Sequence, residues 1–145
     1  MSNADFNILL VDDHAVVRAG YRHLLETQGG FSQVREAENA QEAYVACQKT
    51  LPTLVICDIS MPEPLGLNLI QRVLGRWPEV KFLMFTMHNS IELARACMDA
   101  GAKGYVTKSS RPEVLLRAIG EVLAGRTFMS ADLSRLMALS RLRDN

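Results

Sequence analysis

Two adjacent carboxylates, Asp12 and Asp13, directly follow the apolar run Ile8–Val11. An apolar run of this length is typical of a buried strand, so the two carboxylates are expected at a strand end. Charged side chains are costly to bury unless they are paired with an opposite charge or bind a metal ion. Their position therefore predicts a site that makes use of concentrated negative charge.

Further polar side chains follow later apolar runs in the same way. They are Asp58 after Leu54–Cys57, Thr86 after Phe82–Phe85 and Lys108 just beyond Gly104–Val106. In open parallel sheets, ligands bind beyond the carboxyl ends of the strands, where the strand order reverses. If these runs are parallel strands, three carboxylates, one hydroxyl and one amine converge on one rim of the sheet.

Segments with helical periodicity separate the apolar runs, of which Gln33–Ala37 is the weakest. Apolar residues recur in these segments at i, i+3, i+4 and i+7, as in residues 115–122. Asn39, Asn89 and Ser110 each precede a glutamate by three residues, a spacing that predicts helix starts. Because the strands are short and show no polar alternation, we expect helices on both faces of the sheet. The pattern predicts an α/β fold with a doubly wound, five-stranded parallel sheet.

The predicted rim carries more negative than positive charge. Two carboxylates about 4 Å apart repel each other by about 4 kcal/mol at an effective dielectric constant near 20. Lys108 offsets only one of the three negative charges. A hard divalent cation that prefers oxygen ligands, Mg²⁺ above all, is expected to supply the rest. Asp12 and Asp13 are therefore predicted to hold magnesium.

Asp58 is the best candidate for a reactive carboxylate. An aspartate can accept a phosphoryl group as an acyl phosphate, and this transfer depends mostly on positioning and charge neutralisation. Asp58 stands alone at the end of a central strand. The segment MPEPLG after it favours an irregular loop that keeps the carboxylate accessible.

Taken together, the motifs resemble the receiver domain of two-component response regulators. The segments VDDH and DISMP, the threonine after the fourth strand and GYVTK occur in the family's order, with Gly66 eight residues after Asp58. The resemblance covers roughly residues 5–125. It implies a flavodoxin-like (CheY-like) fold with strand order 2-1-3-4-5. It also implies that a sensor kinase histidine phosphorylates Asp58.

The resemblance implies a magnesium site of four residues. Asp13 would ligate Mg²⁺ directly, and Asp12 would help to position the ion, largely through water. Asp58 and the backbone carbonyl of Ser60 would complete the site. Because Ser60 would contribute its backbone, its side-chain type hardly matters for metal binding.

Three further roles follow from the same resemblance. Thr86 and Lys108 would bind the phosphoryl oxygens on Asp58. Tyr105 would turn inward as Thr86 moves toward the phosphate. From the residues alone, an aromatic side chain at Tyr105 also suits the simpler role of covering the edge of the sheet, so both interpretations stay open.

Within this family, DDHAVVRAG, AENAQEA and AGAKGYVTK most resemble the NarL/FixJ-type subgroup, whose members bind DNA through a C-terminal helix-turn-helix. We expect residues 126–145 to form a further helix or the start of a linker to such an output domain, which these residues do not contain. Transcription regulation is thus expected of a longer parent chain, and homodimers are expected on phosphorylation. A stand-alone receiver that signals by protein–protein contact is an alternative.

Composition argues against several other classes of protein. Sixteen basic residues balance sixteen acidic ones, so overall charge does not favour nucleic acid or a membrane surface. No apolar run approaches the ~20 residues of a membrane span, and no signal peptide is recognisable. Cys47, Cys57 and Cys97 lack the spacing of a metal or redox motif. A cytoplasmic location without membrane contact is expected.

Three rival functions fit the sequence less well. A phosphatase of the haloacid dehalogenase type also uses a strand-end aspartate and Mg²⁺, but it needs a second aspartate where this chain has Ser60. A nucleotide-binding flavodoxin-like protein needs glycines or hydroxyls where DDHAVV would repel an anion. A domain that acts only by binding other proteins would not need all five polar residues predicted at the rim, which are Asp12, Asp13, Asp58, Thr86 and Lys108. We expect a phosphoacceptor domain rather than an enzyme, with at most self-phosphorylation and self-dephosphorylation.

Overall fold

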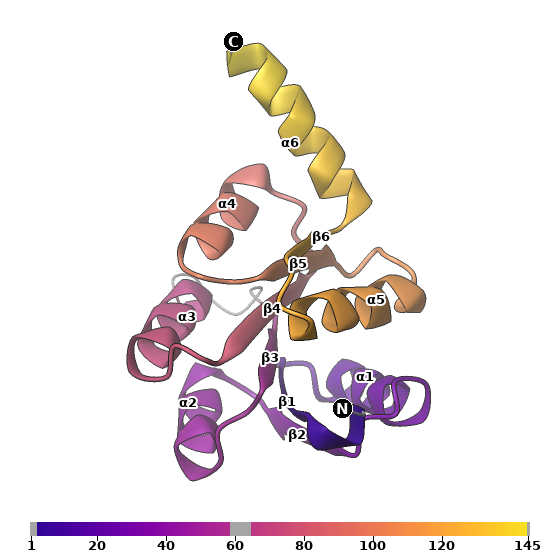
Figure 1. The fold of residues 1–145 in the computed structure, drawn as a ribbon, viewed down its shortest axis with the longest axis vertical. Helices are drawn as coiled ribbons and strands as arrows, with labels where there is room; N and C mark the ends of the chain where they lie inside the picture. The colour runs from indigo at the N-terminus through magenta and orange to yellow at the C-terminus, as the bar shows by residue number, and fades with distance from the viewer. Residues whose placement is uncertain (1–2, 59–64, 145) are drawn as a thin grey trace.

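The computed structural model describes residues 3–58 and 65–144, which form one parallel sheet with helices on both faces (Figure 1). The strands are β1 (Asn7–Val11), β2 (Gln33–Ala37), β3 (Leu54–Cys57), β4 (Lys81–Thr86), β5 (Gly104–Thr107) and β6 (Phe128–Met129). The α-helices are α1 (Ala15–Thr27), α2 (Ala40–Lys49), α3 (Leu65–Arg76), α4 (Ile91–Asp99), α5 (Pro112–Leu123) and α6 (Ala131–Asp144). A short 3-10 helix, Asn3–Asp5, precedes β1.

The strands lie in the order β2-β1-β3-β4-β5-β6, and all neighbouring pairs are parallel. This confirms the predicted α/β fold with order 2-1-3-4-5. The sixth strand is an addition that the sequence pattern does not predict, because β6 has only two residues and no apolar run marks it. Since the chain crosses over between β1 and β3, the rim beyond these two strands is where a ligand is expected.

Successive side chains of each strand pack into two separate apolar layers. Leu9 and Val55 belong to the layer that α2, α3 and α4 cover. Ile8 and Leu54 belong to the opposite layer, under α1 and α5. Figure 1 shows these two groups of helices on opposite sides of the sheet. Both faces of the central strands are buried, which explains why their sequences show no polar alternation.

The helix starts agree only in part with the predicted caps. At α2 the side chain of Asn39 accepts a hydrogen bond from the third helical amide at 2.8 Å, which confirms that cap. The prediction of Asn89 for α4 is wrong, because the capping hydroxyl belongs to Ser90. The prediction of Ser110 for α5 is also wrong, because the cap position is Arg111 and carries no side-chain cap bond. Both errors are shifts of one residue.

The C-terminal residues are attached to the sheet before they leave it. After β6, Ser130 N donates a hydrogen bond to the carbonyl of Tyr105 at 3.1 Å. Leu133, in the first turn of α6, is fully buried, whereas Leu142 near its end is 72% exposed. Figure 1 shows α6 projecting away from the sheet. Helix α6 is therefore anchored to the sheet at its first turn only.

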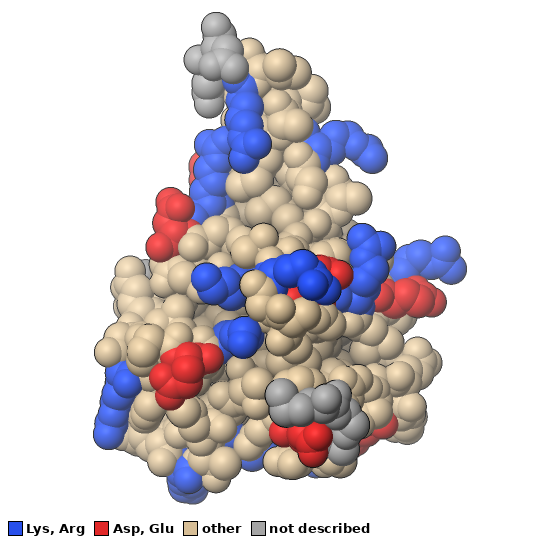
Figure 2. Space-filling view, viewed as in Figure 1, with Lys and Arg blue, Asp and Glu red and all other residues tan. Residues whose placement is uncertain are grey.

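Charge on the surface is mixed. Figure 2 shows Lys and Arg side chains along α6 and across α5, with acidic side chains among them. Among residues 3–58 and 65–144, none of the helices has both the length and the apolar character that crossing a bilayer requires.

The first residue of β5 leaves no room for a side chain. A Cβ atom at Gly104 would lie 2.4 Å from Leu83 Cδ1 and 3.1 Å from Val122 Cγ2. We expect Gly104→Ala to lower the free energy of unfolding by about 1–3 kcal/mol, because overpacking displaces neighbouring side chains. Urea denaturation measures this loss. Gly120→Ala is the control, because a Cβ there meets no atom within 4 Å; an equal loss in both variants would contradict the explanation.

Candidate functional site

Asp12 and Asp58 lie at the ends of the adjacent strands β1 and β3. Asp12 N donates to the carbonyl of Ala37 at 3.1 Å, and Asp58 N donates to that of Val11 at 3.0 Å. These bonds extend the strand ladders by one residue and hold both aspartates at the rim. Asp12 is 3% exposed and Asp58 is 2% exposed. Carboxylates so far from water require a cationic partner.

Lys108 bridges the two buried carboxylates. Its Nζ donates to Asp12 Oδ2 at 2.7 Å and to Asp58 Oδ2 at 2.8 Å. Its backbone amide donates to the carbonyl of Thr86 at 2.7 Å, which fixes the turn after β5 against β4. Burial lowers the pKa of Lys108, but the hydrogen bonds to the two aspartates outweigh burial and raise this pKa above its ordinary value. The lysine is therefore a permanent cation in the site.

Asp13 and His14 extend the cluster toward solvent. Ligand atoms of Asp12, Asp13, His14 and Asp58 all lie within 4.8 Å of one another. The Asp13 side chain is 43% exposed, and its Oδ1 is 2.9 Å from His14 Nδ1. His14 N donates to Asp12 Oδ1 at 2.8 Å. From the sequence, a solvent-facing loop position is favoured for His14 over a ligand role; its side chain is 63% exposed, yet it lies within the acidic cluster.

The donor set of this cluster suits a hard divalent cation. Three carboxylates face one lysine, so negative charge is in excess, and carboxylate oxygens are the ligands that Mg²⁺ prefers. The exposure of Asp13 leaves room for the water ligands that Mg²⁺ usually keeps. Ser60, the remaining predicted ligand, lies outside the described residues.

Thr86 and Tyr105 lie behind the rim, on β4 and β5, and both are fully buried. Thr86 Oγ1 accepts a hydrogen bond from His88 N at 3.2 Å. The Tyr105 hydroxyl donates to the carbonyl of His88 at 2.9 Å. Two side chains from the sheet therefore hold the same residue of the loop after β4. Tyr105 belongs to the apolar layer under α4, whereas the edge of β5 is covered by β6.

Sequence reasoning missed Arg18, in the first turn of α1. Its Nη1 donates to the backbone carbonyl of Asp12, and its Nε donates to Glu36 Oε1 at 2.7 Å. Glu36 also accepts from Arg22 Nη1 at 2.9 Å. Burial raises the pKa of Glu36, but the bonds from Arg22 and Arg18 outweigh it and lower this pKa below its ordinary value. The nearest sequence signal is that Arg18 lies in the segment DDHAVVRAG, five residues after Asp13.

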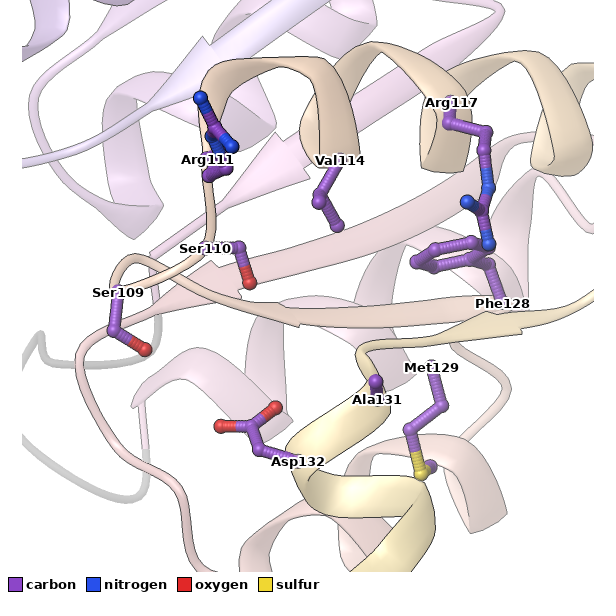
Figure 3. Close-up of a pocket in the computed structure, with 9 residues that line it drawn as sticks. All are labelled: Ser109, Ser110, Arg111, Val114, Arg117, Phe128, Met129, Ala131 and Asp132. Atoms are coloured by element: carbon purple, nitrogen blue, oxygen red, sulfur yellow. The ribbon is translucent and has the colours of Figure 1, made fainter.

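A separate hollow of about 440 Å³ lies between α5 and the start of α6 (Figure 3). Figure 3 shows Arg111, just before α5, and Arg117 from α5 on one side of it and Asp132 from α6 on the other. Asp132 Oδ2 accepts a hydrogen bond from Thr107 Oγ1 at 3.3 Å. Thr107 directly precedes Lys108 in the chain. The residues that line this hollow include none of the rim carboxylates, so it is distinct from the charged site.

Comparison with known proteins identifies close relatives. A family model described as the response regulator receiver domain matches residues 8–120. The response regulator UvrY of Escherichia coli K12 is 37% identical over 136 residues, which are 94% of this chain and 62% of UvrY. The chain thus spans about three fifths of the length of this curated relative.

Solved structures show the same architecture. A two-component response regulator of the LuxR family from Aurantimonas sp. SI85-9A1 is 42% identical, with a TM-score of 0.89 over 94% of this chain and 98% of that one. The receiver domain of RcsB from Salmonella enterica serovar Typhimurium, with phosphomimetic BeF₃⁻, is 29% identical, with a TM-score of 0.79 over 90% and 97%. RcsB dimers bound to DNA match at 27% identity and a TM-score of 0.80, over 92% and 68%.

These relatives agree with the geometry of the rim. The family match spans the strands β1 to β5 that carry the acidic cluster and Lys108. The similarity to a LuxR-family regulator and to UvrY agrees with the predicted NarL/FixJ-type subgroup. The chain therefore belongs to the family of response regulator receiver domains.

Proposed function

We propose that this domain is a phosphorylation-controlled switch in which Asp58 accepts a phosphoryl group from the histidine of a sensor kinase. The observation that carries the proposal is the Lys108 bridge, which holds the Asp58 and Asp12 carboxylates in one cluster with Asp13. In the transfer, the phosphorus–nitrogen bond to the kinase histidine breaks as a phosphorus–oxygen bond to Asp58 forms. The sensor kinase is thus the proposed partner.

Magnesium is the proposed cofactor. Asp12, Asp13 and Asp58 would hold the ion, and the resemblance adds the backbone carbonyl of Ser60. When bound, Mg²⁺ supplies positive charge beside the transferring phosphoryl group. Lys108 Nζ, already 2.8 Å from Asp58 Oδ2, is placed to bind a phosphoryl oxygen.

Thr86 and Tyr105 are the proposed switch residues. If the Thr86 hydroxyl turns toward a phosphoryl oxygen, it gives up its bond with His88 N, and the loop after β4 changes position. Tyr105 is coupled to this loop through its own bond to His88. Shifting such an equilibrium from 1:99 to 99:1 needs about 5.5 kcal/mol. A few hydrogen bonds to charged groups, at about 1.5–3 kcal/mol each, supply that free energy.

Phosphoryl labelling tests this function directly. The purified chain is incubated with acetyl phosphate and Mg²⁺, and the adduct is located by tandem mass spectrometry. We expect one phosphoryl group, on Asp58. When EDTA chelates the metal before acetyl phosphate is added, we expect no labelling. No adduct, or an adduct on another side chain, would contradict the proposal.

The larger protein is proposed to regulate transcription in the cytoplasm. UvrY and the RcsB of the DNA complex are longer than this chain, as their coverage shows. We propose that residues 5–125 are the phosphoacceptor unit and that residues 126–145 connect it to an output domain that binds DNA. Because β6 and the start of α6 are attached to the sheet, we expect this connection to respond to phosphorylation of the receiver.

Phosphorylation is expected to increase self-association of this domain. The known structure of RcsB contains dimers on DNA, and a change in the loop after β4 alters the surface around α4 and β5. Sedimentation velocity with and without beryllofluoride and Mg²⁺ measures the mass. We expect dimers only with both additions; an unchanged mass would contradict this part of the proposal.

A further inference from the structure

Arg18 joins the backbone beneath the metal site to an ion pair on a neighbouring strand. The Arg18 side chain is only 14% exposed. Its Nη1 donates to the carbonyl of Asp12, while its Nε donates to Glu36 Oε1 at 2.7 Å. Glu36 belongs to β2, directly beside Leu10 of β1 in the sheet register. The arginine is therefore fixed to the sheet at one nitrogen and to the rim at another.

The carbonyl of Asp12 is part of the peptide group that leads to Asp13. Other bonds fix the rest of Asp12: its amide to Ala37, and its carboxylate to Lys108 and to His14 N. The contact from Arg18 fixes the plane of the next peptide group. That plane sets the direction in which Asp13 leaves the strand, and the half-exposed Asp13 side chain itself contacts the exposed ring of His14, at 2.9 Å.

The geometry of this contact requires an arginine. One planar guanidinium donates to a carboxylate through Nε and to a carbonyl through Nη1, in directions fixed by the group itself. A lysine in the same position carries the charge on one rotatable ammonium and cannot make both bonds with this geometry. Glu36 pairs with both Arg18 and Arg22, and Glu26 lies 3.5 Å from Arg22. Two glutamates thus balance two arginines, so Arg18 orients the peptide without adding a net cation beside the metal site.

We infer that Arg18 is a positioning residue for the metal site, which aligns the two adjacent aspartates for a divalent cation by holding the carbonyl between them. The inference rests on the proposed function, because it assigns the cluster of Asp12, Asp13 and Asp58 to Mg²⁺. Residues that orient metal ligands from behind commonly change metal affinity by about 10–100-fold when they are mutated. We expect an effect of about tenfold here.

The test measures Mg²⁺ affinity by isothermal titration calorimetry on the whole chain. Arg18→Met and Arg18→Lys are both expected to raise the Kd for Mg²⁺ about tenfold, although lysine keeps the charge. With acetyl phosphate, both variants should need more Mg²⁺ for half-maximal labelling of Asp58. At saturating Mg²⁺ their labelling rates should approach the wild-type rate, because the loss lies in metal binding.

Arg35→Met is the matched control. Arg35 also donates to backbone carbonyls, those of Ala46 at 3.0 Å and Thr50 at 2.7 Å, but on the side of β2 away from the rim. A purely structural effect of losing an arginine–carbonyl contact would appear in both variants. We expect the Kd of Arg35→Met to equal that of the wild type.

The outcomes separate the two proposals. If wild-type protein binds Mg²⁺ and Arg18→Met binds it as tightly, the role of Arg18 is wrong while the metal site stands. If the wild type binds no Mg²⁺, the proposed function itself fails. Should Arg18→Met lose its fold by circular dichroism, Glu36→Gln tests the same point, because it weakens the hold on Arg18 and keeps every rim residue. An unchanged Kd in Glu36→Gln would then overturn the inference.

Discussion

Replacing Asp58 with asparagine is expected to abolish phosphoryl uptake from acetyl phosphate. The amide is close in shape to the carboxylate, but it lacks the anionic oxygen that forms the bond to phosphorus. Intact-mass spectrometry after incubation with acetyl phosphate and Mg²⁺ measures the result. The labelled fraction of Asp58→Asn should fall to the background of a sample without phosphodonor.

The control for this substitution is Asp99→Asn, which makes the same chemical change at an exposed aspartate in the last turn of α4. Its labelling should equal that of the wild type. Circular dichroism of both variants confirms that the fold is intact. Labelling of Asp58→Asn at the wild-type rate would place the reactive group elsewhere and refute the assignment.

Replacing Lys108 with methionine is expected to lower the free energy of unfolding by about 3–5 kcal/mol in buffer without Mg²⁺. The side chains of Lys108, Asp12 and Asp58 are 7%, 4% and 2% exposed, so the substitution leaves two buried carboxylates without their cation. Urea denaturation with and without MgCl₂ measures the change. Added Mg²⁺ should stabilise this variant more than the wild type, because the proposed magnesium site then holds no lysine that offsets its negative charge, and an ion that binds only the folded state stabilises it.

Lys103→Met serves as the control for Lys108→Met, because Lys103 is exposed and lies just before β5. Its effect should stay within about 0.5 kcal/mol, as is usual for surface substitutions. Adding Asp12→Asn to Lys108→Met should recover part of the lost stability, since one uncompensated charge is then removed. If Lys108→Met unfolds like Lys103→Met, the salt bridges at the rim contribute nothing measurable.

The sheet could be predicted from sequence because its strands are buried on both faces. Runs such as Leu54–Cys57 contain no polar residue, and the observed strand has the same bounds as the predicted one. Helix starts were less well predicted, because neighbouring residues compete for one cap. Asn89 and Ser90 both can cap α4, and only the packed structure decides that Ser90 does so.

The rim was predictable for a topological reason. Parallel strands deliver their last residues to one edge, so the aspartates Asp12 and Asp58 and the lysine Lys108 could be placed together without coordinates. Contacts that depend on how far a side chain reaches could not be predicted in this way. Arg18 meets the carbonyl of Asp12 only because α1 packs beside β2, and no spacing rule relates an arginine on a helix to a backbone oxygen on a strand.

The two-residue strand β6 also bears on how the molecule behaves at high concentration. The exposed edge of a sheet is a template on which another chain can pair and aggregate. Here Phe128 N and Ser130 N occupy the carbonyls of Lys103 and Tyr105, so the long edge of β5 is closed. The new edge, β6, is too short for another chain to pair with it. Cutting the chain before Phe128 would expose the edge of β5 in its place and favour aggregation.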